Sequence, residues 1–213
     1  MAPSDMPLTE HTVQADVALC LVLAANVLNI VAFVSHTWAV PHGKENQYGS
    51  FGYGLWKYCD SDKEANQGFC GSLTTGKEPA WLKASQAMMV LGFICMILVM
   101  LTQLGYICVR SLSGRKNVVI LFSLLCLPAA IFSLIGTVVY GTQMNGFVTE
   151  AGFTYAKLAW GFILANVAIG VVLLAGALGL AELHFNPKLN IKEEPMIALE
   201  APVPVVEIPP LRY

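Results

Sequence analysis

Charged residues are scarce in this chain of 213 residues, of which Asp, Glu, Lys and Arg together make up 12%. A soluble domain of this length carries about twice that fraction. Hydrophobic residues, by contrast, make up 56% of the chain. Between Asp16 and Lys157 the charges fall almost entirely within residues 44–83, within residues 110–116 and at Glu150. This distribution excludes an ordinary soluble domain and leaves long uncharged segments that a membrane would accept.

The chain also lacks the usual residue patterns of catalysis and cofactor binding. Its four histidines are dispersed, and none has a carboxylate or thiol companion at the spacing of a metal site. The sequence has no glycine-rich loop for phosphate and no basic patch for nucleic acid. No acidic or basic residue lies in the middle of an apolar segment, so there is no candidate relay for protons or ions. We therefore predict that the protein is not an enzyme, holds no metal or cofactor, and does not bind nucleic acid.

Four apolar segments are long enough to cross a bilayer, which takes about 20 residues of helix. They span roughly residues 13–35, 84–109, 118–140 and 156–181. Each is apolar all round, without the periodicity of a soluble amphipathic helix. Because a helix satisfies its own backbone hydrogen bonds in lipid, we predict four transmembrane helices. The predicted fold class is an all-α membrane protein with a four-helix bundle, and its first partner is the lipid bilayer.

The first apolar segment is predicted to be a retained helix and not a cleaved signal peptide. A signal peptide has a basic start and an apolar region of about 7–15 residues. Here the apolar run is longer, and residues 1–12 contain no Lys or Arg. All four segments therefore count as membrane helices in the prediction.

The charges between the apolar segments predict the orientation in the membrane. The short connection at residues 110–116 holds three basic residues and no acid, which favours the cytoplasmic side. Four spans then place both termini in the cytoplasm and residues 36–83 outside the cell, at the plasma membrane. That outer loop has five lysines of its own, but it is long and its acids balance them. We predict a transmembrane domain over residues 1–182 and a proline-rich cytoplasmic tail over residues 183–213.

Cysteine is present at six positions, and only Cys59 and Cys70 lie outside the apolar segments. On the outer side of a membrane a disulfide between them would persist, which supports the predicted orientation. The alternative is a pair of free thiols in a cytosolic loop. The other four are expected to be buried free thiols, and they are Cys20, Cys95, Cys108 and Cys126. Cys108, near the cytoplasmic end of its segment, is the candidate for palmitoylation.

The outer loop carries an aromatic and glycine-rich stretch at residues 47–58 with partial alternation. Such a pattern favours short strands joined by tight turns, in which glycine takes dihedrals that other residues resist. A Cys59–Cys70 disulfide would close a loop of about twelve residues there and add about 3 kcal/mol of stability. Trp38 and Trp56 are candidates for packing against the strands or for anchoring at the lipid headgroups, and we favour packing for Trp56.

The spacing of Trp38, Gly54-Leu55-Trp56, Cys59 and Cys70 resembles the first-loop signature of the claudin superfamily. That superfamily includes the peripheral myelin protein, the epithelial membrane proteins, the lens fibre membrane protein and the gamma subunits of ion channels. Residues 80–89 and 153–160 are similar to the helix entries of the myelin and epithelial branch, so the resemblance covers residues 13–182. It implies a claudin-like fold, in which four transmembrane helices carry a small disulfide-pinned β-sheet in the first extracellular loop.

Several departures distinguish the chain from claudins proper. Gln86 stands where claudins usually carry an arginine, and glutamine is closer to the myelin and epithelial type. The chain has no Asn-x-Ser/Thr site, although that branch often has one in this loop. The charged residues that line paracellular pores in some claudins have no clear counterpart here. These differences weaken a role as a tight-junction pore and leave the predicted fold unchanged.

Polar and small residues inside the apolar segments indicate how the helices pack. Asn26 and Asn29 are three residues apart, so they share one face of the first helix and are expected to form interhelical hydrogen bonds. The fourth segment is rich in glycine and alanine, which allows close helix approach. That approach is either within the bundle or toward a partner subunit, and both interpretations stay open here.

The tail ends in Leu211-Arg212-Tyr213, with apolar side chains at the last and third-last positions. A scaffold domain that captures a C-terminal carboxylate and adds the peptide as a strand, as PDZ domains do, could accept this ending. A chance apolar ending is the alternative. Leu211 and Tyr213 are therefore the candidate ligand for a cytoplasmic scaffold.

These observations predict two candidate functions of different classes and a third that has less support. The first is a structural protein whose extracellular loops organise membranes or cell–cell contacts, through self-association in cis or trans or through another membrane protein. The second is an auxiliary subunit that docks on an ion channel or receptor and changes its gating. The third is a tight-junction barrier or paracellular pore. Adhesion predicts sensitivity at the loop tip, residues 60–68, whereas channel modulation predicts sensitivity on a lipid-facing helix stripe.

Overall fold

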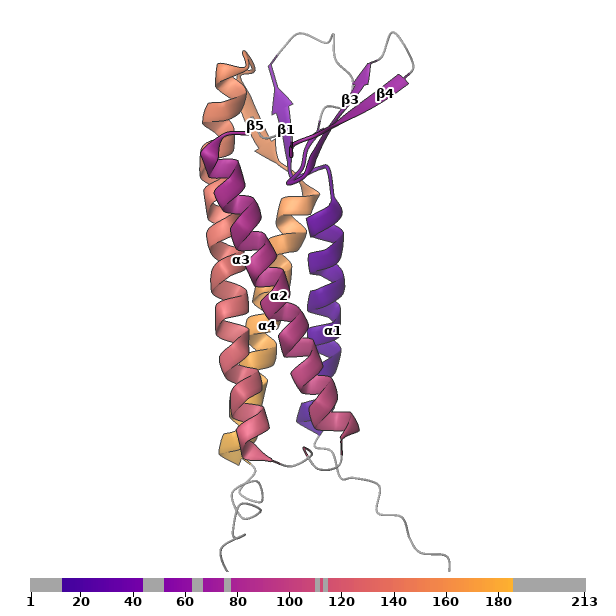
Figure 1. The fold of residues 1–213 in the computed structure, drawn as a ribbon, viewed down its shortest axis with the longest axis vertical. Coiled ribbons are helices and arrows are strands. Elements are labelled where there is room, and N and C mark those ends of the chain that lie inside the picture. The colour runs from indigo at the N-terminus through magenta and orange to yellow at the C-terminus, as the bar shows by residue number, and fades with distance from the viewer. Residues whose placement is uncertain are drawn as a thin grey trace, which may run out of the picture.

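Four long helices form a bundle in the computed structural model of the protein (Figure 1). The structure describes residues 13–43, 52–62, 67–74, 78–109, 112 and 115–185. The helices are α1 (Val13–Val34), α2 (Ala80–Cys108), α3 (Lys116–Glu150) and α4 (Trp160–Phe185). All are long and apolar enough to cross a membrane. The predicted four-helix membrane fold is confirmed.

The helix ends differ from the predicted ones because apolar composition marks the part of a helix that crosses lipid, not the whole helix. α2 begins at Ala80, directly after Pro79 and ahead of the predicted start at residue 84. α3 continues past the predicted end at residue 140 to Glu150. α4 begins at Trp160, since residues 156–158 belong to a strand and not to the predicted helix. α4 also runs beyond residue 182, so the predicted domain boundary falls inside a helix.

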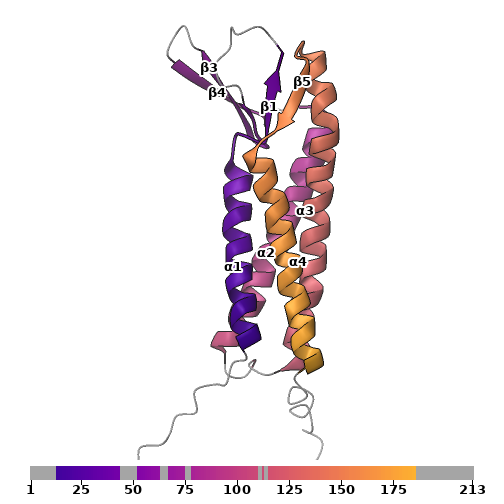
Figure 2. The same ribbon diagram turned by 180° about the vertical axis from the view of Figure 1, so that it is seen from behind.

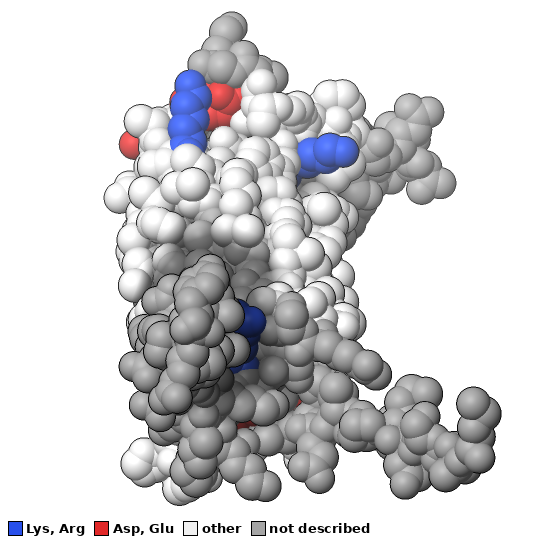
Figure 3. Space-filling model, turned by 60° about the horizontal axis from the view of Figure 1, so that its bottom comes forward, with Lys and Arg blue, Asp and Glu red and all other residues white. Residues whose placement is uncertain are grey.

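The exposed apolar side chains mark the part of the bundle that faces lipid. On α3 they run from Ile120 to Val138, a length of about 28 Å at 1.5 Å per residue, close to the roughly 30 Å of a hydrocarbon core. Beyond Val138 the exposed residues of α3 include Thr142 and Thr149. The last turns of α3 therefore stand outside the membrane, beside the sheet (Figure 1). In Figure 3, blue and red atoms lie in the upper part of the view, and a further blue group lies lower, next to grey atoms.

A five-stranded antiparallel sheet covers one end of the bundle (Figures 1 and 2). Its strands are β1 (Ala39–His42), β2 (Gly52–Tyr53), β3 (Lys57–Asp62), β4 (Gln67–Ser72) and β5 (Tyr155–Leu158), in the order β4-β3-β2-β1-β5. β5 follows α3, so the sheet joins the two connections on this side of the membrane. The prediction placed the sheet in the first loop alone and missed β5.

Polar side chains link the helices inside the bundle. α2 packs most extensively on α3 and α1 on α4, whereas α1 and α2 share a smaller contact. Across that smaller contact the Asn26 Nδ2 group donates to the carbonyl of Met96 at 3.4 Å, and Gln103 Nε2 donates to the carbonyl of Ala15 at 3.0 Å. Asn29 is buried as well, but its Nδ2 group has no hydrogen-bond partner among the described residues. The expected interhelical bond is therefore present for Asn26 and not for Asn29.

The small residues of α4 pack inside the bundle. Its buried small residues are Gly161, Ala165, Ala168, Ala175, Gly176 and Gly179. A side-chain carbon at Gly176 would lie 2.9 Å from Cβ of Cys126, and one at Gly179 would lie 2.6 Å from Oγ of Ser123. At these positions α4 approaches α3 too closely for a larger residue. Packing within the bundle is thus the interpretation that the structure supports.

Candidate interaction surface

Cys59 and Cys70 form a disulfide that joins β3 to β4, with an S–S distance of 2.09 Å. They lie opposite each other in the ladder, with a Cα–Cα distance of 4.1 Å. The N–H of Leu73 donates to the carbonyl of Trp56, and bonded pairs alternate along the ladder from that point, so Cys59 and Cys70 are a non-hydrogen-bonded pair. The predicted disulfide is confirmed, and it closes the hairpin farthest from the centre of the sheet.

Trp38 fastens the start of the sheet to three helices. Its side chain is fully buried, and its Nε1–H donates to the carbonyl of Ala32 at 2.7 Å, near the end of α1. Its ring meets Tyr140 of α3 edge-on, with ring centroids 5.1 Å apart, and it meets Phe162 of α4 in the same way at 6.1 Å. Trp38 is therefore a buried scaffold residue and not an anchor at the lipid headgroups.

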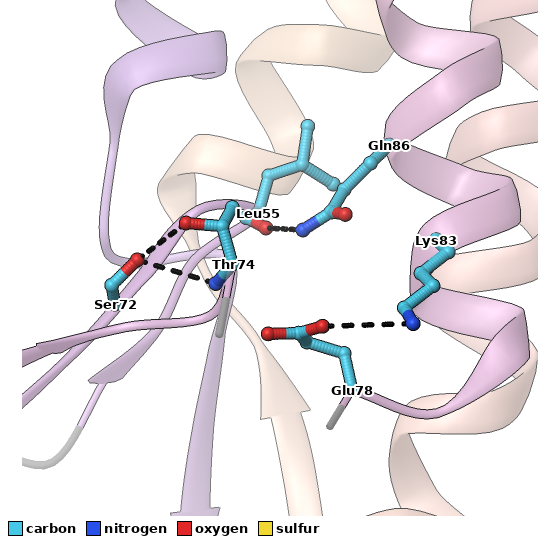
Figure 4. Close-up of polar contacts among 6 residues, drawn as sticks. All are labelled: Leu55, Ser72, Thr74, Glu78, Lys83 and Gln86. Atoms are coloured by element: carbon cyan, nitrogen blue, oxygen red, sulfur yellow. Dashed lines mark hydrogen bonds and ion pairs between the residues drawn. The ribbon is translucent and has the colours of Figure 1, made fainter. Parts of the chain in front are cut away.

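Gly54 and Leu55 form the tight crossing between β2 and β3. A side-chain carbon at Gly54 would collide with the carbonyl of Ser35 and lie 2.6 Å from Cα of His36, so only glycine fits. Leu55 is fully buried, and its carbonyl accepts a hydrogen bond from Gln86 Nε2 at 2.8 Å (Figure 4). Gln86, which departs from the claudin pattern, is thus a donor that ties α2 to the loop. The glutamine at position 86 therefore stabilises the fold, and because it is buried it does not indicate whether the protein forms a pore.

Trp56 packs against Phe33 near the end of α1, beneath the sheet. Its ring lies 5.1 Å from that of Phe33 on α1, which in turn stacks on Phe93 of α2 at 5.3 Å. Trp56 was expected to pack against the strands, whereas the ring contact that the structure shows is with Phe33 of α1. The exposed tryptophan at this end of the bundle is Trp160, the first residue of α4, at 47% exposure. A headgroup anchor therefore fits Trp160 better than Trp38 or Trp56.

Aromatic rings form a row across one face of the sheet. From Phe147 on α3 the row runs to Tyr53, then to Tyr58 and to Phe69, with ring centroids 5.7, 6.1 and 6.4 Å apart in turn. Tyr58 lies directly over Gly71, where a side-chain carbon would overlap its ring. Phe69, at the end of the row on β4, is 65% exposed. The row links the outermost strand to the bundle and ends in an exposed aromatic side chain.

The two edges of the sheet differ. At the β5 edge, Oδ1 of Asn145 on α3 accepts a hydrogen bond from the N–H of Ala156 at 2.8 Å. β5 therefore lies between β1 and the protruding end of α3 (Figure 2). Within the described ranges β4 pairs with β3 alone, and it leans away from the helices in both views (Figures 1 and 2). The sheet thus has one covered edge and one open edge.

A short polar segment leads from β4 into α2 (Figure 4). The Oγ atom of Ser72 accepts a hydrogen bond from the N–H of Thr74 at 3.2 Å and lies 2.6 Å from Thr74 Oγ1. At the start of α2, Nζ of Lys83 lies 3.9 Å from Oε2 of Glu78. The Lys83 side chain is 52% exposed, so this ion pair contributes little stability. Lys83 remains accessible on the sheet side of the bundle.

Comparison with protein families identifies this arrangement. The sequence model of the PMP-22/EMP/MP20/Claudin family matches residues 12–179, a stretch that reaches from before α1 into α4. The chain belongs to this family. The comparison with curated proteins finds no match. Membership in the PMP-22/EMP/MP20/Claudin family confirms the resemblance that the loop signature indicated, and the four helices and the disulfide agree with it.

The free cysteines of this family member differ in exposure. Cys126 is buried, Cys95 is intermediate, and Cys20 and Cys108 are exposed. The expectation of four buried thiols is therefore wrong for the two exposed ones, because an apolar segment has a lipid-facing side as well as a core side. Cys108 is the last residue of α2. Its palmitoylation stays a prediction.

Some of the residues that the sequence analysis singled out lie outside the part of the chain that the structure describes. Leu211 and Tyr213 lie outside the described residues, as do residues 63–66 of the predicted loop tip. Across the described ranges, no group of three or more His, Cys, Asp and Glu side chains could hold a metal ion.

Two parts of this surface were not predicted from the sequence, the strand β5 and the edge contact of Asn145. Gly152, whose φ is 87° in the structure, lies at the turn after α3, and a glycine there is a sequence signal for the end of a helix; the four residues Tyr155–Leu158 are too few and too irregular in pattern to predict a strand by themselves. Asn145 had no such signal, because its role depends on α3 continuing beyond the membrane beside β5.

Proposed function

We propose that this protein organises membranes or cell–cell contacts at the plasma membrane, with the five-stranded sheet outside the cell and both termini in the cytoplasm. One observation supports this most directly: the loop between α1 and α2 and the loop between α3 and α4 contribute strands to the same sheet. Trp38, Leu55 and the aromatic row fix that sheet to the bundle. A surface fixed in advance meets a neighbouring molecule without a further cost of ordering.

Charges and the disulfide support the proposed orientation. Arg115 and Lys116 lie at the start of α3, at the end of the bundle opposite the sheet. Basic residues next to membrane helices favour the cytoplasmic side. Figure 3, in which this end comes forward, shows blue atoms there. A disulfide between Cys59 and Cys70 persists in an oxidising exterior, on the opposite side.

The other two functions have less support. An auxiliary subunit of an ion channel or receptor needs a lateral docking face, and the small residues that could have formed one on α4 are mostly inside the bundle. For a tight-junction barrier or pore, the buried position of Gln86 removes one argument against it but adds none in its favour. Association with a second copy or with another membrane protein remains the partner proposal. A cytoplasmic scaffold at Leu211 and Tyr213 and acylation of Cys108 belong to the same proposal.

A mixed culture of cells tests the proposed function. Fluorescently tagged expressing cells are grown together with non-expressing cells, and the label is measured at boundaries between two expressing cells and at boundaries between unlike cells. We expect enrichment where two expressing cells meet, which supports contact in trans between copies. Uniform label at both kinds of boundary would contradict contact in trans and would direct the search to partners within one membrane.

A further inference from the structure

The apolar core of the bundle falls into two clusters, with a gap between them on every helix. Toward the sheet, the inner cluster reaches as far as Ala25 of α1, Met96 of α2, Ala130 of α3 and Ala168 of α4. The cluster at the sheet end starts at Ala32, Met89, Tyr140 and Ala165 on the same four helices. The residues between these limits form one layer across the bundle, which we call the central layer.

Two polar side chains in the central layer are buried without a hydrogen-bond partner. Asn29 of α1 and Ser133 of α3 are each 1% exposed. Within the described part of the chain, neither Nδ2 of Asn29 nor Oγ of Ser133 has a partner. A polar group that is buried and unpaired loses its hydrogen bonds to water without replacing them. Two such groups in one layer therefore indicate a ligand that both could bind.

Contacts on α2 place the two groups at the same depth in the membrane. A side-chain carbon at Gly92 would collide with Oγ of Ser133, so this hydroxyl lies against α2 at Gly92. On α1, Nδ2 of Asn26 donates to the carbonyl of Met96. Because α1 and α2 run in opposite directions, about one turn toward the sheet from this bond leads to Asn29 on α1 and to Gly92 on α2.

The arrangement of the helices favours a bridging molecule over direct contact. α1 and α3 each pack on α2 and α4, so they are diagonal to each other in the bundle. Asn29 and Ser133 thus come from helices on opposite sides of the bundle axis. A small molecule at that axis can bind both side chains without bringing the two helices together.

We propose that a water molecule is bound in the central layer, where it accepts a hydrogen bond from Asn29 Nδ2 and donates one to Ser133 Oγ. Buried waters make about three hydrogen bonds to polar groups that are otherwise unsatisfied. Asn166 of α4 offers a third partner in this layer. Its Oδ1 has a long contact of 3.5 Å with the Thr137 hydroxyl, so it can accept another hydrogen bond. This site lies in the membrane-spanning part and is independent of the proposed contact function.

NMR spectroscopy of the full chain in lipid nanodiscs tests the site. Dipolar transfer of magnetisation from water to a side-chain amide shows that a water molecule is bound beside it. We expect this transfer at the side-chain amide of Asn29, assigned through its backbone. Asn26 is the matched control on the same helix, because its Nδ2 group already donates to the carbonyls of Val22 and Met96. The transfer to Asn26 should be absent.

Two serine variants show which side chain shares the water. Ser133→Ala should lower the transfer at Asn29 to the level of Asn26, because the water loses one of its partners. Ser85→Ala is the control, since it removes another buried serine, whose hydroxyl donates to the carbonyl of Gly136. The transfer at Asn29 should persist in that variant.

Thermal unfolding separates a bridged amide from an unpaired one. We expect Asn29→Leu to lower the unfolding temperature by about 2–4 °C, and Ser133→Ala to cost little more once Asn29 is replaced. A higher unfolding temperature for Asn29→Leu would mean that leucine relieves an unpaired amide, and it would overturn the proposal. Absence of transfer at Asn29 in the unmodified protein would overturn it as well. If the two substitutions were still non-additive in that case, a direct hydrogen bond would join Asn29 to Ser133 instead.

Discussion

At the scale of single residues, Gly54 is the position where the loop signature has a steric cause. A side-chain carbon there would collide with the backbone of Ser35 and His36, which cannot turn away as a flexible side chain can. We expect Gly54→Ala to destabilise the protein by about 3 kcal/mol or more, enough to prevent its arrival at the cell surface. Gly146→Ala is the matched control, because a carbon there meets nothing within 4 Å and alanine favours a helix. Thermal unfolding in detergent and surface expression measure both, and equal behaviour of the two variants would contradict the steric account.

Trp38 makes a second prediction at this scale. Trp38→Phe removes the hydrogen bond to Ala32 and part of a fully buried ring, at a cost of about 2 kcal/mol. For a protein of this size that cost lowers the unfolding temperature by about 4–8 °C. Trp160→Phe should change it little, since Trp160 is half exposed at the start of α4. A larger shift for Trp160 than for Trp38 would show that the roles of the two residues are reversed.

Gln86 provides a third prediction. Gln86→Leu keeps the volume and removes the donor to the buried carbonyl of Leu55, which should cost about 1–3 kcal/mol. Gln86→Arg restores a donor of the kind that claudins carry and should recover most of that stability. The unfolding temperatures of the two variants decide this, and an arginine variant as unstable as the leucine variant would show that the hydrogen bond to Leu55 is not what the position supplies.

At the scale of elements, the helices were predictable and the fifth strand was not. The membrane requires long apolar helices, so composition alone found all four of them. It failed at their ends, where α2 and α3 continue beyond the apolar segments and where residues 156–158 form a strand ahead of α4. The disulfide was predictable because two cysteines lay outside those helices. β5 is four residues long, and its pairing partner β1 lies more than a hundred residues earlier in the chain. Short strands that pair over such distances leave little local signal.

The contact between α3 and β5 gives a prediction for these elements. Asn145→Ala removes the acceptor for the Ala156 N–H and opens the second edge of the sheet. We expect the Ala156 amide to exchange with deuterium about tenfold faster, while amides in the middle of α3 keep their rates. Thr149→Ala is the control, because the Thr149 hydroxyl donates only to carbonyls of its own helix. Equal exchange at Ala156 in both variants would show that Asn145 does not hold the edge.

At the scale of the whole molecule, we propose that the membrane bundle holds one fixed sheet outside the cell. The family match and the four helices establish the membrane protein. The proposed contact function depends on which side of the membrane the sheet faces. If the sheet were in the cytoplasm, the disulfide would not persist and the sheet could not contact a neighbouring cell.

The most direct test is to label lysines on intact cells with a reagent that cannot cross the membrane. Lys57, Lys83 and Lys157 are exposed on the sheet side, and Lys116 lies at the opposite end of the bundle. Mass spectrometry of the recovered protein identifies the modified lysines before and after the cells are permeabilised. The account predicts that the three sheet-side lysines are modified on intact cells and that Lys116 is modified only after permeabilisation. Modification of Lys116 on intact cells, with the sheet-side lysines protected, would contradict it.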